Sequence, residues 1–94
     1  MLYTTFGRTG ETVSRLGFGG MRFESSTDLD AMAEVAVHAH ERGVTYFDTA
    51  PIYCDDRSEE IFGLALKEMR KSGKPHYITS KTMMAKPDDV RAQC

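Results

Sequence analysis

Short apolar runs alternate along the chain with longer segments in which apolar residues return every three or four positions. The short runs, at residues 15–20, 44–48 and 76–80, predict strands. The longer segments, residues 28–42 and 57–72, have the spacing of amphipathic helices. This alternation of strand and helix predicts an α/β protein whose parallel strands are joined by right-handed helical crossovers.

Two further elements are expected near the ends of the chain. Residues 2–6 and 12–14 flank the turn Gly7-Arg8-Thr9-Gly10, and this arrangement predicts a β-hairpin. A last helix is predicted to begin at Lys86-Pro87, where a proline and two acidic residues suit a first helical turn, and to continue to Cys94.

The ends and faces of the two long helices can also be predicted. Thr27 is the expected N-cap of the first helix, and Asp56 followed by Glu59 resembles a capping box before the second. Gly43 and Gly73 are the expected helix-ending residues. The expected apolar face of the first helix holds Leu29, Met32, Ala33, Ala36 and Ala39 or His40, and that of the second holds Ile61, Leu64, Ala65, Glu68 and Met69.

Composition and charge narrow the class of protein. The 94 residues are 40% hydrophobic and 28% charged, as is usual for one globular domain, and a net charge of -2 gives no attraction to nucleic acid or an anionic membrane. No run approaches the ~20 apolar residues of a membrane span, and residues 1–6 lack the features of a secretory signal. Cys54 and Cys94 lie far apart and suggest neither a disulfide framework nor a metal site, so we expect a cytoplasmic protein.

Three polar residues follow the predicted strands: Asp48 and Tyr53 after the second, and Lys81 after the third. The carboxyl ends of parallel strands meet at one edge, so these side chains should face one another. A phenol with an ordinary pKa near 10 is a poor proton donor at neutral pH, but an adjacent ammonium stabilises the phenolate and strengthens the acid. An aspartate beside the lysine would keep it charged and oriented. The trio is therefore a candidate acid catalyst for a carbonyl oxygen, with hydride supplied by a cofactor, because no side chain supplies one.

Each of these residues also has an ordinary structural interpretation. An aspartate after a strand is often a turn former, and a lysine there is often a solvated surface charge. The G-x-G-x-x-G fingerprint is absent, since Arg22 follows Gly17 and Gly19 where the last glycine would stand. The absence of this fingerprint argues against a doubly wound sheet that binds a dinucleotide. Three strands alone do not distinguish such a sheet from a closed barrel.

The ordered motifs resemble those of the aldo-keto reductase family. The segment F-D-T-A-P-I-Y at residues 47–53 is followed by R-S-E-E at 57–60 and T-S-K at 79–81. Residues 6–10 and 13–19 resemble the family's barrel-bottom hairpin and first strand. The resemblance implies a partial (β/α)8 TIM barrel: an N-terminal β-hairpin plus about three βα units, the third helix incomplete. Residues 1–94 would then be the N-terminal portion of one barrel domain.

The resemblance also implies a role for each matching residue. Tyr53 matches the family's general acid, Lys81 the residue that strengthens that acid, and Asp48 the partner of the lysine. Gly20, Met21 and Arg22 match a loop that lies against the nicotinamide half of NADP(H), and Asp48 matches a residue near its ribose. The implied reaction is hydride transfer from NADPH to an aldehyde or ketone, or its reverse, with a small carbonyl compound as the partner.

Two departures from the family pattern affect these expectations. The family's catalytic histidine should lie beyond Lys81, and His38, His40 and His76 are expected to be structural instead. Position 54, usually glycine in the motif, is Cys54. An alternative function is a non-catalytic, cofactor-sensing regulatory subunit on the same barrel, as in the potassium-channel β-subunit branch of the family. A second is an unrelated α/β protein with a chance motif, which would place Asp48, Tyr53 and Lys81 on different faces.

A polypeptide of residues 1–94 by itself should be only marginally stable and should be inactive. Three parallel strands leave sheet edges open and are expected to expose apolar residues on both faces. A cooperative thermal transition of a soluble monomer at micromolar concentration would contradict the first expectation. NADPH oxidation with a generic aldehyde at the rate of a full-length relative would contradict the second.

Overall fold

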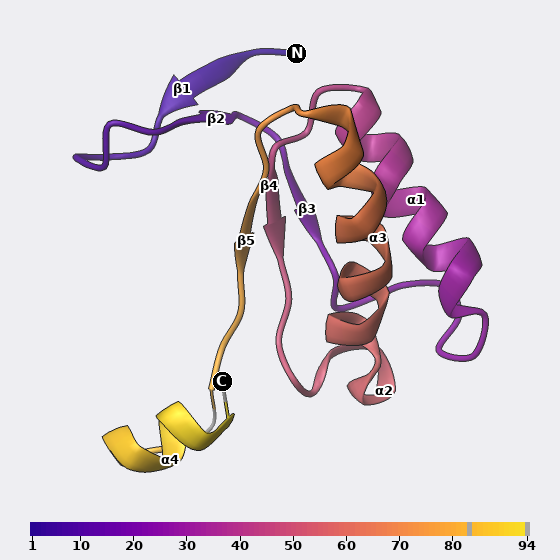
Figure 1. The fold of residues 1–94 in the computed structure, drawn as a ribbon, viewed down its shortest axis with the longest axis vertical. Coiled ribbons are helices and arrows are strands. Elements are labelled where there is room, and N and C mark those ends of the chain that lie inside the picture. The colour runs from indigo at the N-terminus through magenta and orange to yellow at the C-terminus, as the bar shows by residue number, and fades with distance from the viewer. Residues whose placement is uncertain (83, 94) are drawn as a thin grey trace.

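A parallel sheet forms the centre of the computed structural model, which describes residues 1–82 and 84–93. Its strands are β3 (Gly17–Gly19), β4 (Tyr46–Asp48) and β5 (Tyr77–Thr79), in the order β3-β4-β5. Figure 1 shows the three strands running in the same direction. The predicted α/β class and parallel sheet are confirmed; Cys94, the expected end of the last helix, lies outside the described residues.

The predicted hairpin covers the end of the sheet where the strands begin (Figure 1). It consists of β1 (Tyr3–Thr5) and β2 (Thr12–Ser14), paired antiparallel. Ser14 and Thr45 exchange two buried hydrogen bonds of 2.8 and 2.9 Å, each from a backbone N–H to the other's hydroxyl. These bonds attach the hairpin to the segment that leads into β4.

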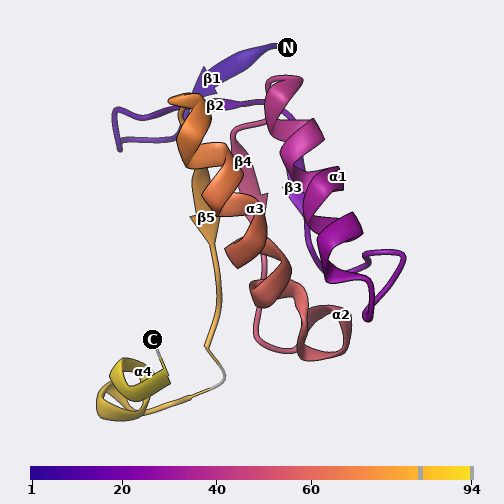
Figure 2. The same ribbon diagram turned by 45° about the vertical axis from the view of Figure 1, so that its right-hand side comes forward.

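Helices α1 (Leu29–Glu41) and α3 (Ser58–Ser72) lie side by side on one face of the sheet (Figures 1 and 2). The register aligns Phe18, Phe47 and Ile78 in one row across the three strands, and this row packs under the helices. Phe47 is fully buried, and its ring lies 5.7 Å from that of Phe18. The hydrophobic core therefore lies between the sheet and the two helices.

The opposite face of the sheet has a different character. Side chains alternate between faces along a strand, so the registered residues there are Gly17, Gly19, Tyr46, Asp48, Tyr77 and Thr79. The Tyr46 hydroxyl shares a 2.5 Å hydrogen bond with Thr79. The expectation of exposed apolar residues on both faces is wrong for these strands. Helices α1 and α3 cover one face, and the other carries glycines, polar groups and the half-buried rings of Tyr46 and Tyr77.

Both predicted N-caps are wrong. Asp28 caps α1, since its carboxylate accepts a hydrogen bond from the Ala31 N–H, whereas the backbone N–H of Thr27 donates to Ser25. Arg57 precedes α3, which has no side-chain cap. Asp56 has a φ of +65°, in the left-handed region, so the backbone before α3 does not have the geometry that a capping box needs. Gly73 ends α3 in the left-handed conformation, as predicted.

The buried face of α3 is displaced slightly from the expected one. Its buried residues are Ser58, Ile61, Phe62, Ala65 and Met69, and those of α1 are Met32, Ala33, Ala36 and His40. Glu68, expected on the apolar face, is exposed and pairs with Lys71 at 3.0 Å. Phe62 lies on the buried face in place of Glu68, because its ring packs against those of Phe18 and Phe47, with centroids 6.2 and 5.9 Å away.

Two short helices complete the described chain. The one-turn α2 (Tyr53–Asp56) lies at the carboxyl end of the sheet, and α4 (Pro87–Gln93) follows β5, apart from α1 and α3 in both views (Figures 1 and 2). In the part of the chain that the structure describes, no helix is long and apolar enough to cross a membrane.

Gly20 allows β3 and α3 to approach closely, and this can be tested. A Cβ at Gly20 would collide with the Ser58 hydroxyl and the Phe62 ring, and would lie 3.1 Å from the Asp48 carbonyl oxygen. We expect Gly20→Ala to lower the free energy of unfolding of the full-length protein by about 1–3 kcal/mol, measured by urea denaturation. Gly19→Ala is the matched control, since nothing lies within 4 Å of its added Cβ. Equal effects at both positions would contradict this packing role.

Candidate active site

The carboxyl ends of β4 and β5 bring Asp48 and Lys81 together. Asp48 is the last residue of β4 and pairs in register with Thr79, the last residue of β5. Lys81 follows Thr79 by two positions, which returns its side chain to the face that carries Asp48. The sheet register thus produces the proximity that the strand-end positions predict.

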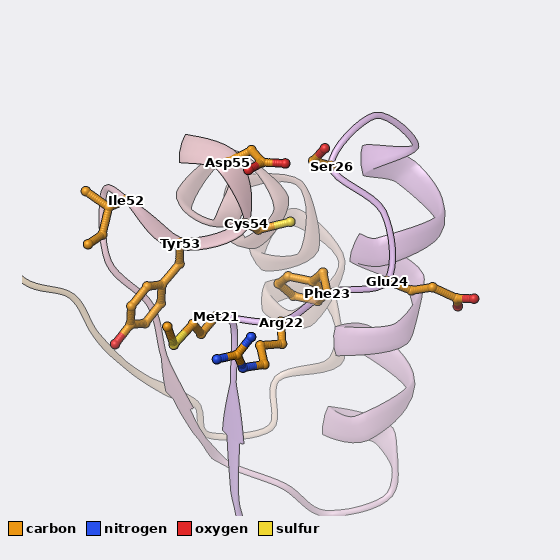
Figure 3. Close-up of a pocket in the computed structure, with 9 residues that line it drawn as sticks. All are labelled: Met21, Arg22, Phe23, Glu24, Ser26, Ile52, Tyr53, Cys54 and Asp55. Atoms are coloured by element: carbon orange, nitrogen blue, oxygen red, sulfur yellow. The ribbon is translucent and has the colours of Figure 1, made fainter.

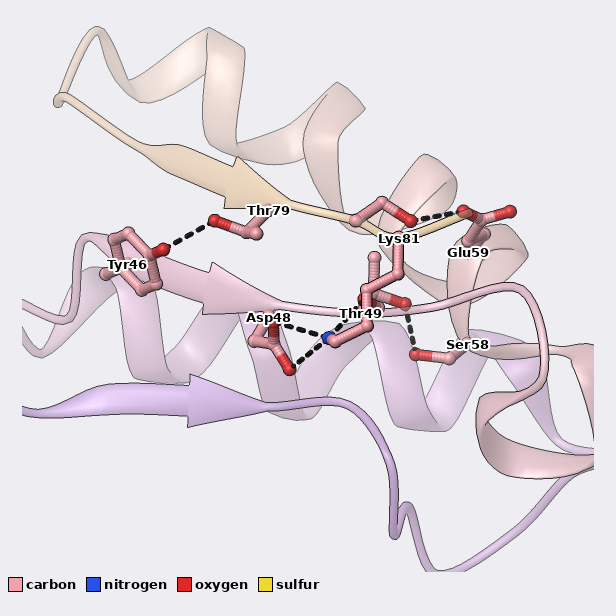
Figure 4. A network of polar contacts seen from close by, with 8 residues as sticks. Tyr46, Asp48, Thr49, Ser58, Glu59, Thr79 and Lys81 are labelled. Atoms are coloured by element: carbon pink, nitrogen blue, oxygen red, sulfur yellow. Dashed lines mark hydrogen bonds and ion pairs between the residues drawn. The ribbon is translucent and has the colours of Figure 1, made fainter. Parts of the chain in front are cut away.

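The ammonium of Lys81 has a defined set of hydrogen-bond acceptors (Figure 4). Its Nζ donates to Asp48 Oδ1 at 2.8 Å, to Asp48 Oδ2 at 2.9 Å and to the Thr49 carbonyl oxygen at 3.0 Å. The hydrogen bonds to the Asp48 carboxylate raise the pKa of Lys81, while partial desolvation opposes the rise. Lys81 therefore stays a cation throughout the neutral range.

Tyr53 lies next to this cation. The Nζ atom of Lys81 is 4.7 Å from the centroid of the Tyr53 ring, within the range of a cation–π interaction. Tyr53 begins α2, where its backbone N–H donates to the Ala50 carbonyl at 3.2 Å. The structure thus brings Asp48, Tyr53 and Lys81 to one place, which excludes the arrangement on different faces that a chance motif would give.

Tyr77 provides a useful contrast, since it is a second tyrosine on the same side of the sheet. Its hydroxyl donates to Glu11 Oε2 at 2.6 Å, and this hydrogen bond raises the pKa of Tyr77. A phenol held by a carboxylate is a weaker proton donor than a free one. Tyr53 has the Lys81 ammonium beside its ring instead of a carboxylate.

A left-handed turn follows Tyr53 directly. Cys54, Asp55 and Asp56 have φ values of +55°, +52° and +65°. Glycine adopts this region without strain, whereas a side chain brings its Cβ too close to the following carbonyl oxygen. The glycine usual at position 54 in the family motif therefore has a backbone reason, and Cys54 occupies a strained position here.

An open cavity of about 420 Å³ adjoins Tyr53 (Figure 3). It is lined by Met21, Arg22, Phe23, Glu24, Ser26, Ile52, Tyr53, Cys54 and Asp55. Of the predicted cofactor loop, Met21 and Arg22 line this cavity and are exposed, whereas Gly20 is buried and its N–H donates to the Asp48 carbonyl at 2.8 Å. Gly20 is therefore packed inside the protein, whereas Met21 and Arg22 are accessible to a ligand.

The three histidines lie away from these residues. His40 is buried on α1, and its Nε2 lies 3.1 Å from the carbonyl oxygen of Pro75, just before β5 begins. His76 stacks edge-on against His40 with ring centroids 5.8 Å apart, and His38 is exposed. His40 and His76 belong to the end of the sheet opposite Lys81, as their expected structural role requires.

Sequence reasoning missed three groups around the ion pair. The Thr49 carbonyl accepts a hydrogen bond from Lys81, the Ser58 hydroxyl bonds the Thr49 hydroxyl at 2.6 Å, and Glu59 bonds Ser80. A backbone carbonyl leaves no signal in a sequence. Glu59 stands at the start of a helix, and the capping-box interpretation assigned it to the helix itself. Ser58 entered only as part of the R-S-E-E motif at residues 57–60.

Comparison with known proteins agrees with the fold and shows the family. The model of the aldo/keto reductase family matches residues 15–94. The aldo-keto reductase YhdN of Bacillus subtilis is 40% identical over 75 residues, covering 76% of this chain and 23% of that protein. A probable voltage-gated potassium channel subunit beta of Arabidopsis thaliana is 34% identical over 70 residues, covering 73% of this chain and 21% of that protein.

A solved structure gives the same result in three dimensions. The crystal structure of a thermostable aldo-keto reductase in complex with the inhibitor epalrestat superposes with a TM-score of 0.79 and 33% sequence identity, covering 98% of this chain and 35% of the other. The fold is that of a partial (β/α)8 barrel. The chain belongs to the aldo/keto reductase family, whose chemistry is oxidoreduction, and it spans about a fifth of the length of the curated relatives it matches.

The strain at position 54 predicts a difference between two substitutions. Cys54→Gly and Cys54→Ala both remove the thiol, but only alanine keeps a Cβ in the left-handed region. We expect the glycine variant to be more stable by about 0.5–1 kcal/mol in urea denaturation of the full-length protein. At Glu34, an exposed position in α1, the same comparison should reverse, with alanine more stable. Glycine no better than alanine at position 54 would contradict the left-handed turn.

Proposed function

We propose that the protein containing this chain is an NADP(H)-dependent oxidoreductase that reduces an aldehyde or ketone carbonyl to an alcohol. The observation that carries the proposal is the ammonium of Lys81, hydrogen-bonded to Asp48 and Thr49 and 4.7 Å from the centre of the Tyr53 ring. A small-molecule carbonyl compound is the proposed partner. The proposed compartment remains the cytoplasm.

The role proposed for Tyr53 is that of general acid. The negative charge that develops on a carbonyl oxygen during reduction must be neutralised by a proton. A phenol can donate it if the resulting phenolate is stabilised, and the cation beside Tyr53 provides that stabilisation. Asp48 in turn keeps Lys81 charged and aimed, because both carboxylate oxygens accept its hydrogen bonds.

The exposed groups at this end of the sheet fit the nicotinamide half of a dinucleotide. Arg22 lines the cavity beside Tyr53 and offers a cation to a phosphate, and Met21 offers an apolar surface to a ring. The side chain of Asp48 is 39% exposed, so its carboxylate remains accessible to a ribose hydroxyl while it binds Lys81. A bound nicotinamide would supply the hydride that the carbonyl carbon needs, and Tyr53 would supply the proton that completes the alcohol at the oxygen.

A regulatory function is the second candidate, favoured by the relatives named as potassium channel β-subunits. A subunit of that kind would bind NADP(H) without appreciable turnover. The presence of Asp48, Tyr53 and Lys81 in contact favours the enzyme, since a sensor needs no proton donor. Cofactor binding without carbonyl reduction by the wild-type protein would favour the regulatory function.

The enzyme function predicts a large effect at Tyr53. In the full-length protein, Tyr53→Phe should lower kcat/KM for a generic aldehyde about 10²–10⁴-fold, because it removes the proton donor, while NADPH affinity measured by fluorescence titration stays unchanged. Tyr77→Phe is the matched control and should retain activity, since its hydroxyl bonds Glu11 in the hairpin. Undiminished turnover in Tyr53→Phe would refute the role of Tyr53.

A further inference from the structure

The first two residues of α3 do not cap their own helix but contact the ends of two strands (Figure 4). Ser58 shares a 2.6 Å hydrogen bond with Thr49, the residue after Asp48. Glu59 Oε1 accepts a 2.5 Å hydrogen bond from the hydroxyl of Ser80, the residue before Lys81. One helical turn therefore contacts the chain next to each member of the ion pair.

The contact with β4 is rigid. Ser58 and Thr49 are 0% and 2% exposed, so their hydrogen bond is shielded from water and would be costly to break. Gly20 packs directly against the Ser58 hydroxyl, which leaves no room for that side chain to turn toward β3. The start of α3 is thus fixed relative to the end of β4.

The end of β5 is held more loosely. In the part of the chain that the structure describes, the bond from the Thr49 N–H to the Thr79 carbonyl, 2.8 Å long, is the last backbone hydrogen bond between the two strand ends. Ser80 and Lys81 lie beyond it. Their position relative to Asp48 therefore depends on side-chain contacts, namely those of the Lys81 ammonium and the bond from Ser80 to Glu59.

We propose that Glu59 is a positioning residue for the proposed reaction, acting on Lys81 through Ser80. Ser58 fixes the start of α3 to the end of β4. The hydrogen bond between Glu59 and Ser80 therefore determines the position of the chain after β5 relative to Asp48 and Tyr53. Without the hydrogen bond from Ser80 to Glu59, the main chain at Ser80 can move away from α3. The Lys81 ammonium can then stay bonded to Asp48 while it moves away from the Tyr53 ring. This inference rests on the proposed function, since it concerns the geometry of the same proton donor.

The test uses the full-length protein and four variants: Glu59→Ala, Glu59→Gln, Ser80→Ala and the double variant Glu59→Ala with Ser80→Ala. We expect Glu59→Ala to lower kcat/KM about tenfold and to move the alkaline limb of its pH profile to higher pH, since a more distant ammonium stabilises the phenolate less. Ser80→Ala should reproduce both effects, and the double variant should add nothing. Glu59→Gln, whose amide oxygen still accepts the hydroxyl, should retain most of the activity.

Glu60→Ala is the matched control, because this neighbouring glutamate pairs with Arg57 at the surface at 3.0 Å. Its activity and pH profile should equal those of the wild type.

If Glu59→Ala and Ser80→Ala lower the melting temperature but leave the pH profile unchanged, the contact is only structural and the proposal is wrong. If Glu59→Ala does not fold, Ser80→Ala, a change at an exposed residue, decides the matter alone. Loss of activity in Tyr53→Phe with normal pH profiles in these variants would reject this inference and leave the proposed function intact.

Discussion

The burial of Phe47 in the central strand determines which side of the sheet is open to chemistry. Its ring is fully buried between the sheet and the helices, 5.7 Å from Phe18 and 5.9 Å from Phe62. Because neighbouring side chains on a strand point to opposite faces, Asp48 must lie on the side away from the helices. The same alternation places Lys81 there from β5. The core thus fixes the orientation of the site independently of its polar contacts.

The ion pair itself contributes little to holding this arrangement. Asp48 and Lys81 are 39% and 42% exposed, and ion pairs in contact with water are weakened by screening. Greater restraint comes from groups behind it: the Thr49 carbonyl, the buried bond between Thr49 and Ser58, and the close packing of Gly20 on Ser58. Because buried groups next to the pair restrain it, Asp48 and Lys81 can stay half-exposed, and their charges remain accessible to a ligand. The charges of a fully buried pair would not be accessible.

Much of the fold and part of the site could be predicted from the residues. The order of strands and helices, the hairpin, and the meeting of Asp48, Tyr53 and Lys81 follow from periodicity and from strand-end positions. The helix caps could not be predicted, since Thr27 and Asp28 are both good capping residues and only the path of the loop selects Asp28. The left-handed turn at Cys54 also escaped prediction, because the residue there is not the glycine that would reveal it.

The sequence by itself determined the class of fold, the polar trio and the family, because apolar spacing and a short ordered motif are local properties of the chain. The tertiary structure decided how the trio is held. It placed Ser58 against Thr49, and Glu59, the expected capping-box partner of Asp56, against Ser80. It also assigned Gly20 to packing against α3. These assignments depend on the distance between a helix start and two strand ends, and that distance exists only once the sheet register and the α3 packing have formed.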